Sequence, residues 1–206
     1  MRSSSIFVMA AGLLSSALAV SSPATVSNLQ LSGDCDFDDI RVVEENGEYY
    51  IAAFFDSIYA QTDGFVTFDR KRCTMNYDIE LAPHYQLDLF QFSVNGTYQL
   101  SDMGTARLTV SHRAANGPSV RTTAQYSLKA GDDYAGEFVD YTGDITRWDL
   151  KPDYQRCGAR IPVESSIHVH ATQPSYDQSG STLIVMDDGT SSHYTKLCKI
   201  KYKPCY

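Results

Sequence analysis

The chain has 206 residues and a formal net charge of −8 at neutral pH. An acidic chain repels nucleic acid and anionic lipid, which argues against both as main partners. The length is sufficient for one domain with a hydrophobic core, and no linker-like stretch or internal repeat divides it.

The N-terminal residues have the pattern of a secretory signal peptide. A positive start at Arg2 precedes an apolar run from Ile6 to Leu14, which is too short to span a bilayer. Ala17-Leu18-Ala19 then matches a signal peptidase site. We expect residues 1–19 to be removed, residues 20–32 to form a flexible segment and residues 33–206 to form one domain. We expect a secreted, extracellular protein, and the sequence contains no second long apolar stretch that would act as a membrane anchor.

Strand signals dominate the remaining chain, which is rich in Tyr, Phe, Thr and Val and contains turn residues at short intervals. Asn46-Gly47 is typical of a type I′ hairpin turn between strands at 40–44 and 48–55. The basic run Arg70-Lys71-Arg72 is expected to separate two strands, and Asn95-Gly96 to form a turn. Further strands are expected at residues 64–68, 73–81, 85–94, 97–100, 105–113, 120–128, 137–141, 166–172, 181–186 and 194–203. This spacing predicts an all-β fold, a single antiparallel β-sandwich of jelly-roll or immunoglobulin-like type.

Five cysteines follow the signal peptide, and in an oxidising compartment this number predicts two disulfides and one free thiol. We favour the pairs Cys35–Cys73 and Cys157–Cys205, because each then closes a loop within one half of the chain. Cys198 is left as the free thiol. It stands seven residues from Cys205, so on one strand the two side chains would face opposite sides and could not form a bridge. The chain has no Cys-x-x-Cys spacing that would indicate zinc.

Several short motifs resemble the DUF4360 family of secreted proteins, which are frequent in filamentous fungi. Gly33-Asp34-Cys35 opens the similar region, and Phe54-Phe55-Asp56-Ser57-Ile58-Tyr59-Ala60 resembles a Phe-Asp-x-Phe-x-Ala element. Arg70-Lys71-Arg72-Cys73-Thr74-Met75-Asn76 resembles an Arg-Lys-x-Cys-x-Leu/Met-Asn step. Trp148, Cys157-Gly158 and a terminal Tyr202-Lys203-Pro204-Cys205 complete the pattern. The resemblance implies a secreted β-rich domain with two disulfides, and it supports the same pairing because Cys198 lies outside the pattern. It carries no catalytic residues to transfer.

Two histidines are candidate metal ligands. In Ile167-His168-Val169-His170, His168 and His170 point to the same face of a strand, as in a two-histidine metal site. A third ligand would come from His84, His112 or His193. The alternative, which alternation alone predicts, is an outward polar face opposite Ile167 and Val169.

Acidic residues offer two weaker candidate sites. Clustered acids could hold calcium, although the EF-hand spacing is absent and solvated turn acids are the explanation we favour. These clusters are Asp34, Asp36, Asp38 and Asp39, Asp132-Asp133, and Asp187-Asp188. Sugar hydrolysis needs two carboxylates in a cleft, and Glu80, Glu137 and Glu164 are the acids closest to expected strands. With 25 acidic residues in the chain, the sequence singles out no catalytic pair.

Surface recognition has its own candidates. Asn95-Gly96-Thr97 is an N-glycosylation acceptor. Trp148 and Tyr154 are candidates for a ligand-binding face, together with other tyrosines that would stack on sugars; the alternative for these aromatics is ordinary strand packing. The further tyrosines are Tyr49, Tyr50, Tyr59, Tyr77, Tyr85, Tyr98, Tyr126, Tyr134 and Tyr141.

The sequence contains no nucleophile elbow, no Ser/His/Asp set and no phosphate-binding glycine loop. We therefore expect a secreted, non-catalytic, monomeric protein without a cofactor that acts by surface recognition. Its expected partner is a cell-wall glycan or a host protein, as for a fungal effector. A carbohydrate-binding or carbohydrate-active jelly-roll protein is the alternative, and a metal-dependent protein using His168 and His170 is a third possibility.

Overall fold

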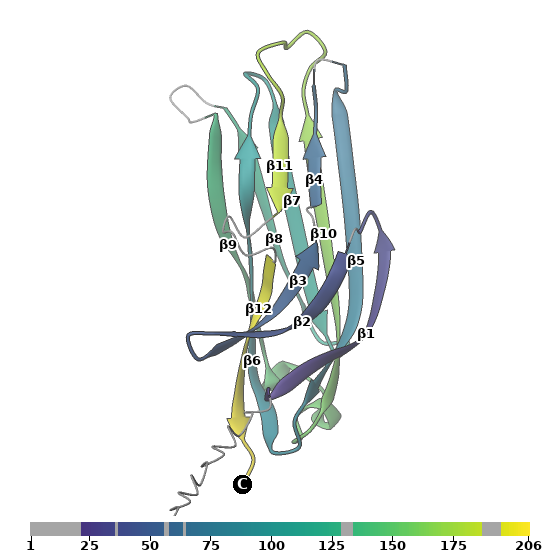
Figure 1. Ribbon diagram of the computed structural model, residues 1–206, viewed down its shortest axis with the longest axis vertical. Coiled ribbons are helices and arrows are strands. Elements are labelled where there is room, and N and C mark those ends of the chain that lie inside the picture. Colours follow the sequence, from purple (N-terminus) through teal and green to yellow (C-terminus); the bar gives the residue numbers. More distant parts are fainter. Residues whose placement is uncertain (1–21, 36, 56–57, 64, 129–133, 187–194) are drawn as a thin grey trace, which may run out of the picture.

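The computed structural model describes residues 22–35, 37–55, 58–63, 65–128, 134–186 and 195–206 (Figure 1). The expected signal peptide at residues 1–19 lies outside this part, as do Asp36, Asp132, Asp133, Asp187, Asp188 and His193. No helix in the described part is both long enough and apolar enough to cross a bilayer.

The described residues form strands almost throughout. The strands are β1 (Ala24–Gly33), β2 (Phe37–Glu45), β3 (Glu48–Phe55), β4 (Ile58–Gln61), β5 (Phe68–Leu81), β6 (Tyr85–Gln99), β7 (Thr105–Ala114), β8 (Ser119–Ser127), β9 (Ala135–Thr146), β10 (Arg160–Thr172), β11 (Leu183–Met186) and β12 (Thr195–Pro204). Two short 3-10 helices, η1 (Arg147–Asp149) and η2 (Pro152–Tyr154), connect β9 to β10.

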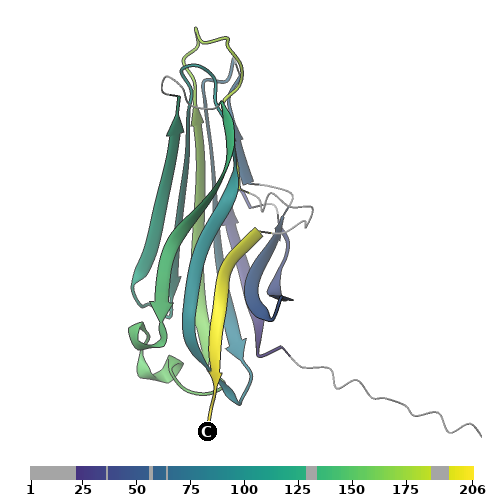
Figure 2. The same cartoon turned by 90° about the vertical axis from the view of Figure 1, so that its left-hand side faces the viewer.

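Two antiparallel sheets pack face to face in an elongated sandwich (Figures 1 and 2). In the described part, one sheet has five strands in the order β1-β5-β10-β7-β8. The other has seven, in the order β2-β3-β12-β6-β11-β4, with β9 paired to β6. The predicted all-β antiparallel sandwich is confirmed.

Alternating side chains explain why these segments form half-buried strands. Along β10, Ile161, Val163, Ile167 and Val169 point into the core, together with Ser165, and are at most 2% exposed, whereas the residues between them face outward. Because side chains alternate between the two faces of a strand, one face packs against the second sheet and the other meets solvent. The outer face of the five-stranded sheet is therefore free to carry polar function.

Both predicted disulfides are present. Cys35 is bonded to Cys73 across a Cα–Cα distance of 4.8 Å, and Cys157 to Cys205 across 6.2 Å. Cys198 is a buried free thiol, as predicted. The two loops span sequence separations of 38 and 48 residues. In the chain-entropy model each bond stabilises the fold by about 4 kcal/mol.

The expected flexible segment at residues 20–32 is wrong for residues 24–32. They form most of β1, which pairs with β5 from Ala24 opposite Leu81 to Gly33 opposite Cys73. Ala24 is 1% exposed and Val26 packs against the core, so this polar-looking segment contributes apolar side chains to one face. As an edge strand, β1 needs fewer apolar residues than a central strand, which is why its composition resembles that of a loop.

Two predicted strand breaks are also wrong, whereas the Asn46-Gly47 hairpin is confirmed, with φ values of 52° and 78°. The run 70–72 continues β5, with its two arginines facing outward. The dipeptide Asn95-Gly96 lies inside β6 rather than in a turn. A Cβ atom at Gly96 would approach the Val185 carbonyl oxygen to 2.2 Å, so this glycine serves close strand contact.

Candidate functional site

The outer face of the five-stranded sheet brings outward-facing side chains of four paired strands into rows. The register places Arg70 beside His170, and His170 beside Arg107. In the next row Arg72 is opposite His168, and one row further Ser166 is opposite Ser111, which is opposite Arg121. Neighbouring strands lie about 4.8 Å apart, so arginines from β5 and β7 are about 10 Å apart at the backbone.

These rows line a concavity of about 480 Å³, which we call the arginine groove. Its basic side chains are Arg70, Arg72, Arg107 and Arg121, and it also contains Phe68, Thr109, Ser111, Ser166, His168 and His170. Glu164 is the one acid among the lining residues, and it lies at the end of the groove. The arrangement is notable because the whole chain has a net charge of −8.

The four arginines have no ion-pair partner in the described part of the chain. Four guanidinium groups on adjoining strands repel one another, which is a cost that a purely structural surface has no reason to maintain. An anion bound between them would relieve that repulsion and accept hydrogen bonds from the planar guanidinium donors.

The two histidines lie between the arginines. Partial burial lowers the pKa of His168, and the positive charges of Arg72, Arg121 and Arg70 lower it further. Burial also lowers the pKa of His170, with Arg107 and Arg70 contributing. Both imidazoles are therefore biased toward the neutral form, and a bound anion would reverse part of this effect.

Hydroxyl groups link this face to the strands around it. The Ser166 hydroxyl lies 3.2 Å from Nε2 of His168 and 3.3 Å from the Thr74 hydroxyl. His170 packs edge-on against the Phe68 ring, with centroids 4.8 Å apart, and its Nε2 is buried without a hydrogen-bond partner.

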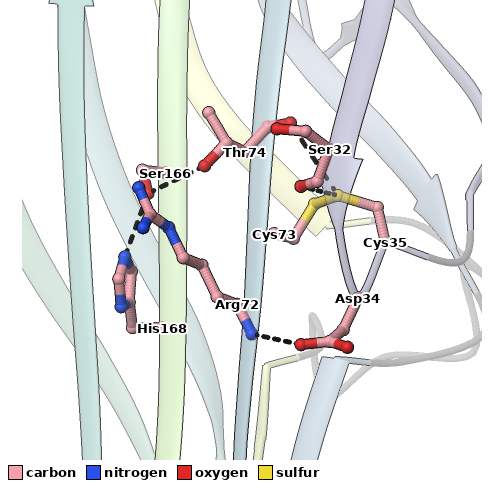
Figure 3. Close-up of a disulfide and its surroundings, with 8 residues drawn as sticks. All are labelled: Ser32, Asp34, Cys35, Arg72, Cys73, Thr74, Ser166 and His168. Atoms are coloured by element: carbon pink, nitrogen blue, oxygen red, sulfur yellow. Dashed lines mark hydrogen bonds between the residues drawn. A yellow bond between two sulfur atoms is a disulfide. The ribbon is translucent and has the colours of Figure 1, made fainter.

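The Gly33-Asp34-Cys35 motif positions β5, the strand that carries Arg70 and Arg72, which we call the arginine strand (Figure 3). The Asp34 backbone N–H donates to the Arg72 carbonyl at 2.6 Å, and the Arg72 N–H donates to the Asp34 carboxylate at 3.0 Å. Gly33 has φ of 92°, and a Cβ atom there would come within 2.3 Å of the Arg72 carbonyl oxygen. The Cys35–Cys73 bond then holds both segments. The motifs Gly33-Asp34-Cys35 and Arg70-Lys71-Arg72-Cys73 therefore lie side by side next to the arginine groove.

The metal hypothesis gains little from this geometry. His168 and His170 do share an outward face, but His112 is buried on the inner side of β7. His84 lies in the turn after β5, and His193 is outside the described residues. Within the described part, no group of three potential ligand side chains comes together. The surrounding arginines would also repel a cation.

The acidic candidates do not converge. Glu80 accepts a hydrogen bond from Ser27 and lies 3.7 Å from Arg160, whereas Glu137 is on β9 of the other sheet. Glu164 therefore has no second carboxylate beside it in the arginine groove. The Asp34 carboxylate accepts a hydrogen bond from the Arg72 backbone N–H, and the Asp39 carboxylate lies 3.7 Å from Nε of Arg41. Among the described residues, the lining of the groove thus lacks the pair of carboxylates that acid–base cleavage of a sugar uses.

The aromatic candidates do not line the groove. Trp148 on η1 is 71% exposed, with the Arg147 guanidinium 4.0 Å from its ring centroid. Tyr154 packs against the core, and Tyr77 is buried. Other tyrosines form separate clusters, one of Tyr49, Tyr85 and Tyr202 and one of Tyr98 and Tyr126 with Phe138. Asn95 faces outward from β6 on the other sheet, and its glycosylation stays a prediction.

The arginines were not singled out from the sequence, although a signal was present. Arg70 and Arg72 are two residues apart, which places them on one face of a strand. The contributions of Arg107 and Arg121 depend on the pairing of β7 with β10 and β8. β7 and β8 are consecutive strands, but the pairing of β10 with β7 and β5 joins segments far apart in the sequence, so the groove becomes visible only in the folded chain.

Comparison with known proteins gives no family assignment. No protein-family model matches the chain, and no curated protein matches it significantly. Among solved structures, the carbohydrate-binding module TmCBM61 in complex with β-1,4-galactotriose is 12% identical, with 78% of this chain and 86% of that chain covered and a TM-score of 0.27. The non-crystalline cellulose-specific module CBM28 is 11% identical, covering 81% and 86%, with a TM-score of 0.28. At these values the similarity gives no argument about the ligand.

Proposed function

We propose that this chain is a secreted, non-catalytic protein that binds an acidic polysaccharide across the arginine groove. The observation that carries the proposal is a set of four arginines around two histidines on one face of an acidic chain, none of them in an ion pair with a described residue. Guanidinium groups form paired hydrogen bonds with carboxylate and sulfate-like oxyanions. Export and membership of the DUF4360 family are parts of this proposal, supported by the N-terminal pattern and the disulfides.

An acidic glycan fits the groove better than a nucleic acid does. The arginines occupy a patch that spans four strands, from β5 to β8, with three inter-strand spacings or about 14 Å between its edges, and the chain as a whole is negatively charged. A long polyanion such as duplex nucleic acid would meet repulsion outside that patch. Oligosaccharides carrying a few uronate or sulfate groups place their charges on the patch alone, and their hydroxyls pair with Ser166, Ser111 and Thr109.

The proposal is tested by calorimetric titration of the mature protein with a galacturonate hexamer. The double variant Arg70→Ala/Arg107→Ala removes two guanidinium groups from one row. Each charged hydrogen-bonding group contributes about 1.5–3 kcal/mol, so we expect the dissociation constant to rise at least about 10-fold for each arginine lost. The matched control is Lys151→Ala/Arg156→Ala, which removes two exposed positive charges outside the groove.

Equal losses in the two double variants would show a diffuse charge effect and contradict the proposal. A poly-glutamate peptide of equal charge is the second probe. We expect it to bind more weakly than the hexamer because it lacks hydroxyls for the serines and threonine of the groove. Equal or tighter binding of the peptide would assign the groove to an acidic protein partner instead.

A further inference from the structure

A second concavity adjoins the arginine groove on the same sheet face and encloses about 590 Å³. It crosses β1, β5, β10 and the end of β7, and it shares Glu164 with the arginine groove. Its polar side chains include the carboxamides of Asn28, Gln30, Asn76 and Asn116. We call it the carboxamide pocket.

Among the described residues, most carboxamides of this pocket form no hydrogen bond through their side chains. The Asn28 side chain donates to the Asp78 carboxylate at 2.6 Å. No hydrogen bond to another described side chain or to described backbone engages the amide groups of Gln30, Asn76 or Asn116. Each free amide offers both donors and an acceptor to whatever enters the pocket.

The charges of the pocket differ from those of the arginine groove. Arg113 is its one lining base, opposite Glu164 in the same row. The second acid, Asp78, is held by Arg160 through bonds of 2.6 and 3.0 Å. The pocket therefore has no excess of positive charge, and its carboxylates disfavour an anionic group.

Unusual backbone conformations are concentrated at this pocket. Of the non-glycine residues described with positive φ, Asn28, Ala115 and Asn116 line it, and the fourth is Asn46 in the β2–β3 hairpin. Asn28 lies in a register irregularity of β1, between Ser27 and Gln30. Such irregularities re-aim side chains and occur often next to binding sites.

We infer that the carboxamide pocket is a second subsite, which binds a neutral, hydroxyl-rich sugar unit of the same glycan whose acidic unit lies in the arginine groove. The inference rests on the proposed function. A hydroxyl both donates and accepts a hydrogen bond, so adjacent hydroxyls of a sugar ring match the paired donor and acceptor of a carboxamide. The ligand class becomes a heteropolysaccharide in which acidic and neutral units occur in one chain.

The register supports one continuous ligand. From the row of Arg72 and His168, the row of Asn76 and Glu164 is four residues further along β5, about 13 Å away. Glu164 borders both sites, so no strand or loop separates them. A single oligosaccharide lying along the strands would contact the arginines at one end and the carboxamides at the other.

The test compares two acidic probes by calorimetry. A galacturonate hexamer is charged at every unit, whereas a hyaluronan hexasaccharide alternates uronate with a neutral amino sugar. We expect Gln30→Ala/Asn76→Ala to weaken the hyaluronan hexasaccharide at least 5-fold and the galacturonate hexamer less than 2-fold. The control is Gln125→Ala, an exposed carboxamide on β8 that lines neither site; it should change neither affinity.

The outcomes separate the two proposals. If both acidic probes bind but the double variant affects them equally or not at all, the second subsite is overturned and the arginine groove stands. If neither acidic probe binds the native protein, the proposed function fails and the subsite fails with it. If the double variant unfolds at the same temperature as the native protein, any loss of affinity is local to the pocket.

Discussion

His112 is a titratable side chain sealed inside the sandwich. Its Nδ1 lies 2.8 Å from the Ser165 hydroxyl, which lies 3.1 Å from the Tyr77 hydroxyl. The ring stacks on Phe92 at 4.2 Å, and Nε2 has no hydrogen-bond partner. Burial lowers the pKa of His112 to about 3, so the imidazole is neutral in the folded protein at neutral pH.

This burial predicts that the fold loses stability in mild acid. The folded-state pKa lies below the ordinary value of 6.5, so the unfolded chain takes up the proton first as the pH falls. The contribution of the neutral His112 to the free energy of unfolding is fully present above about pH 6.5. It declines toward pH 3 by about 1.4 kcal/mol per pH unit. Denaturant unfolding of native protein and His112→Asn across this range is the measurement. If the free energy of unfolding depends on pH with the same slope in both proteins, the prediction is contradicted, whereas a shallower dependence in the variant supports it.

At the scale of one strand, β10 places His168 and His170 outward between cations. The groups that face them are Arg70 and Arg72 from β5, Arg107 from β7, Arg121 from β8, and Glu164 from β10 itself. Burial and, after it, the arginine charges lower both imidazole pKa values, so a bound anion that shields the arginines should raise those values. Binding of an acidic ligand should then be accompanied by proton uptake.

The affinity for the galacturonate hexamer should therefore increase as the pH falls from 7 to 5, while the ligand carboxylates remain ionised. Titrations in two buffers of different ionisation enthalpy measure the protons taken up. The double variant His168→Asn/His170→Asn should bind with little dependence on pH. A native protein that releases protons on binding, or binds equally at both pH values, would show that the histidines are not coupled to the ligand.

Strand β6 shows what a glycine does inside a sheet. A Cβ atom at Gly96 would lie 2.2 Å from the Val185 carbonyl oxygen and 2.7 Å from the Phe138 ring. Gly96→Ala should destabilise the fold by about 1–3 kcal/mol, because β11 or β9 must shift. Gly180→Ala is the matched control, since a Cβ atom there meets nothing within 4 Å. Denaturant unfolding of both variants gives the comparison, and similar stabilities would contradict the assigned role.

The same residues show which features the sequence could predict. Alternation located most strands, because burial of one face requires it, and Asn46-Gly47 located its hairpin by local backbone preference. Asn95-Gly96 has the same local chemistry but lies mid-strand, since the close approach of β11 requires a residue without a side chain. The arginine groove depends on which strands pair, and the pairing of β10 with β5 and β7, which are far from it in the sequence, is not encoded in any local pattern.

Across the whole molecule, the two disulfides close loops of similar size but hold different regions. Cys35–Cys73 joins the end of β1 to the arginine strand, while Cys157–Cys205 ties the segment before β10 to the C-terminal end of β12. The Asp34–Arg72 backbone pairing lies next to the first bond and far in sequence from the second. The bonds should therefore be similar in their effect on stability and different in their effect on binding.

We expect each double serine variant to lose about 4 kcal/mol of unfolding free energy in the chain-entropy model. Cys35→Ser/Cys73→Ser should also weaken the galacturonate hexamer, about 3-fold or more, because the backbone beside Arg72 loses its covalent anchor. Cys157→Ser/Cys205→Ser should bind as the native protein does, provided that calorimetry is run well below its unfolding temperature. Equal affinities in the two variants would mean that β5 keeps Arg72 in place without the Cys35–Cys73 bond, and that the Gly33-Asp34-Cys35 motif serves the fold alone.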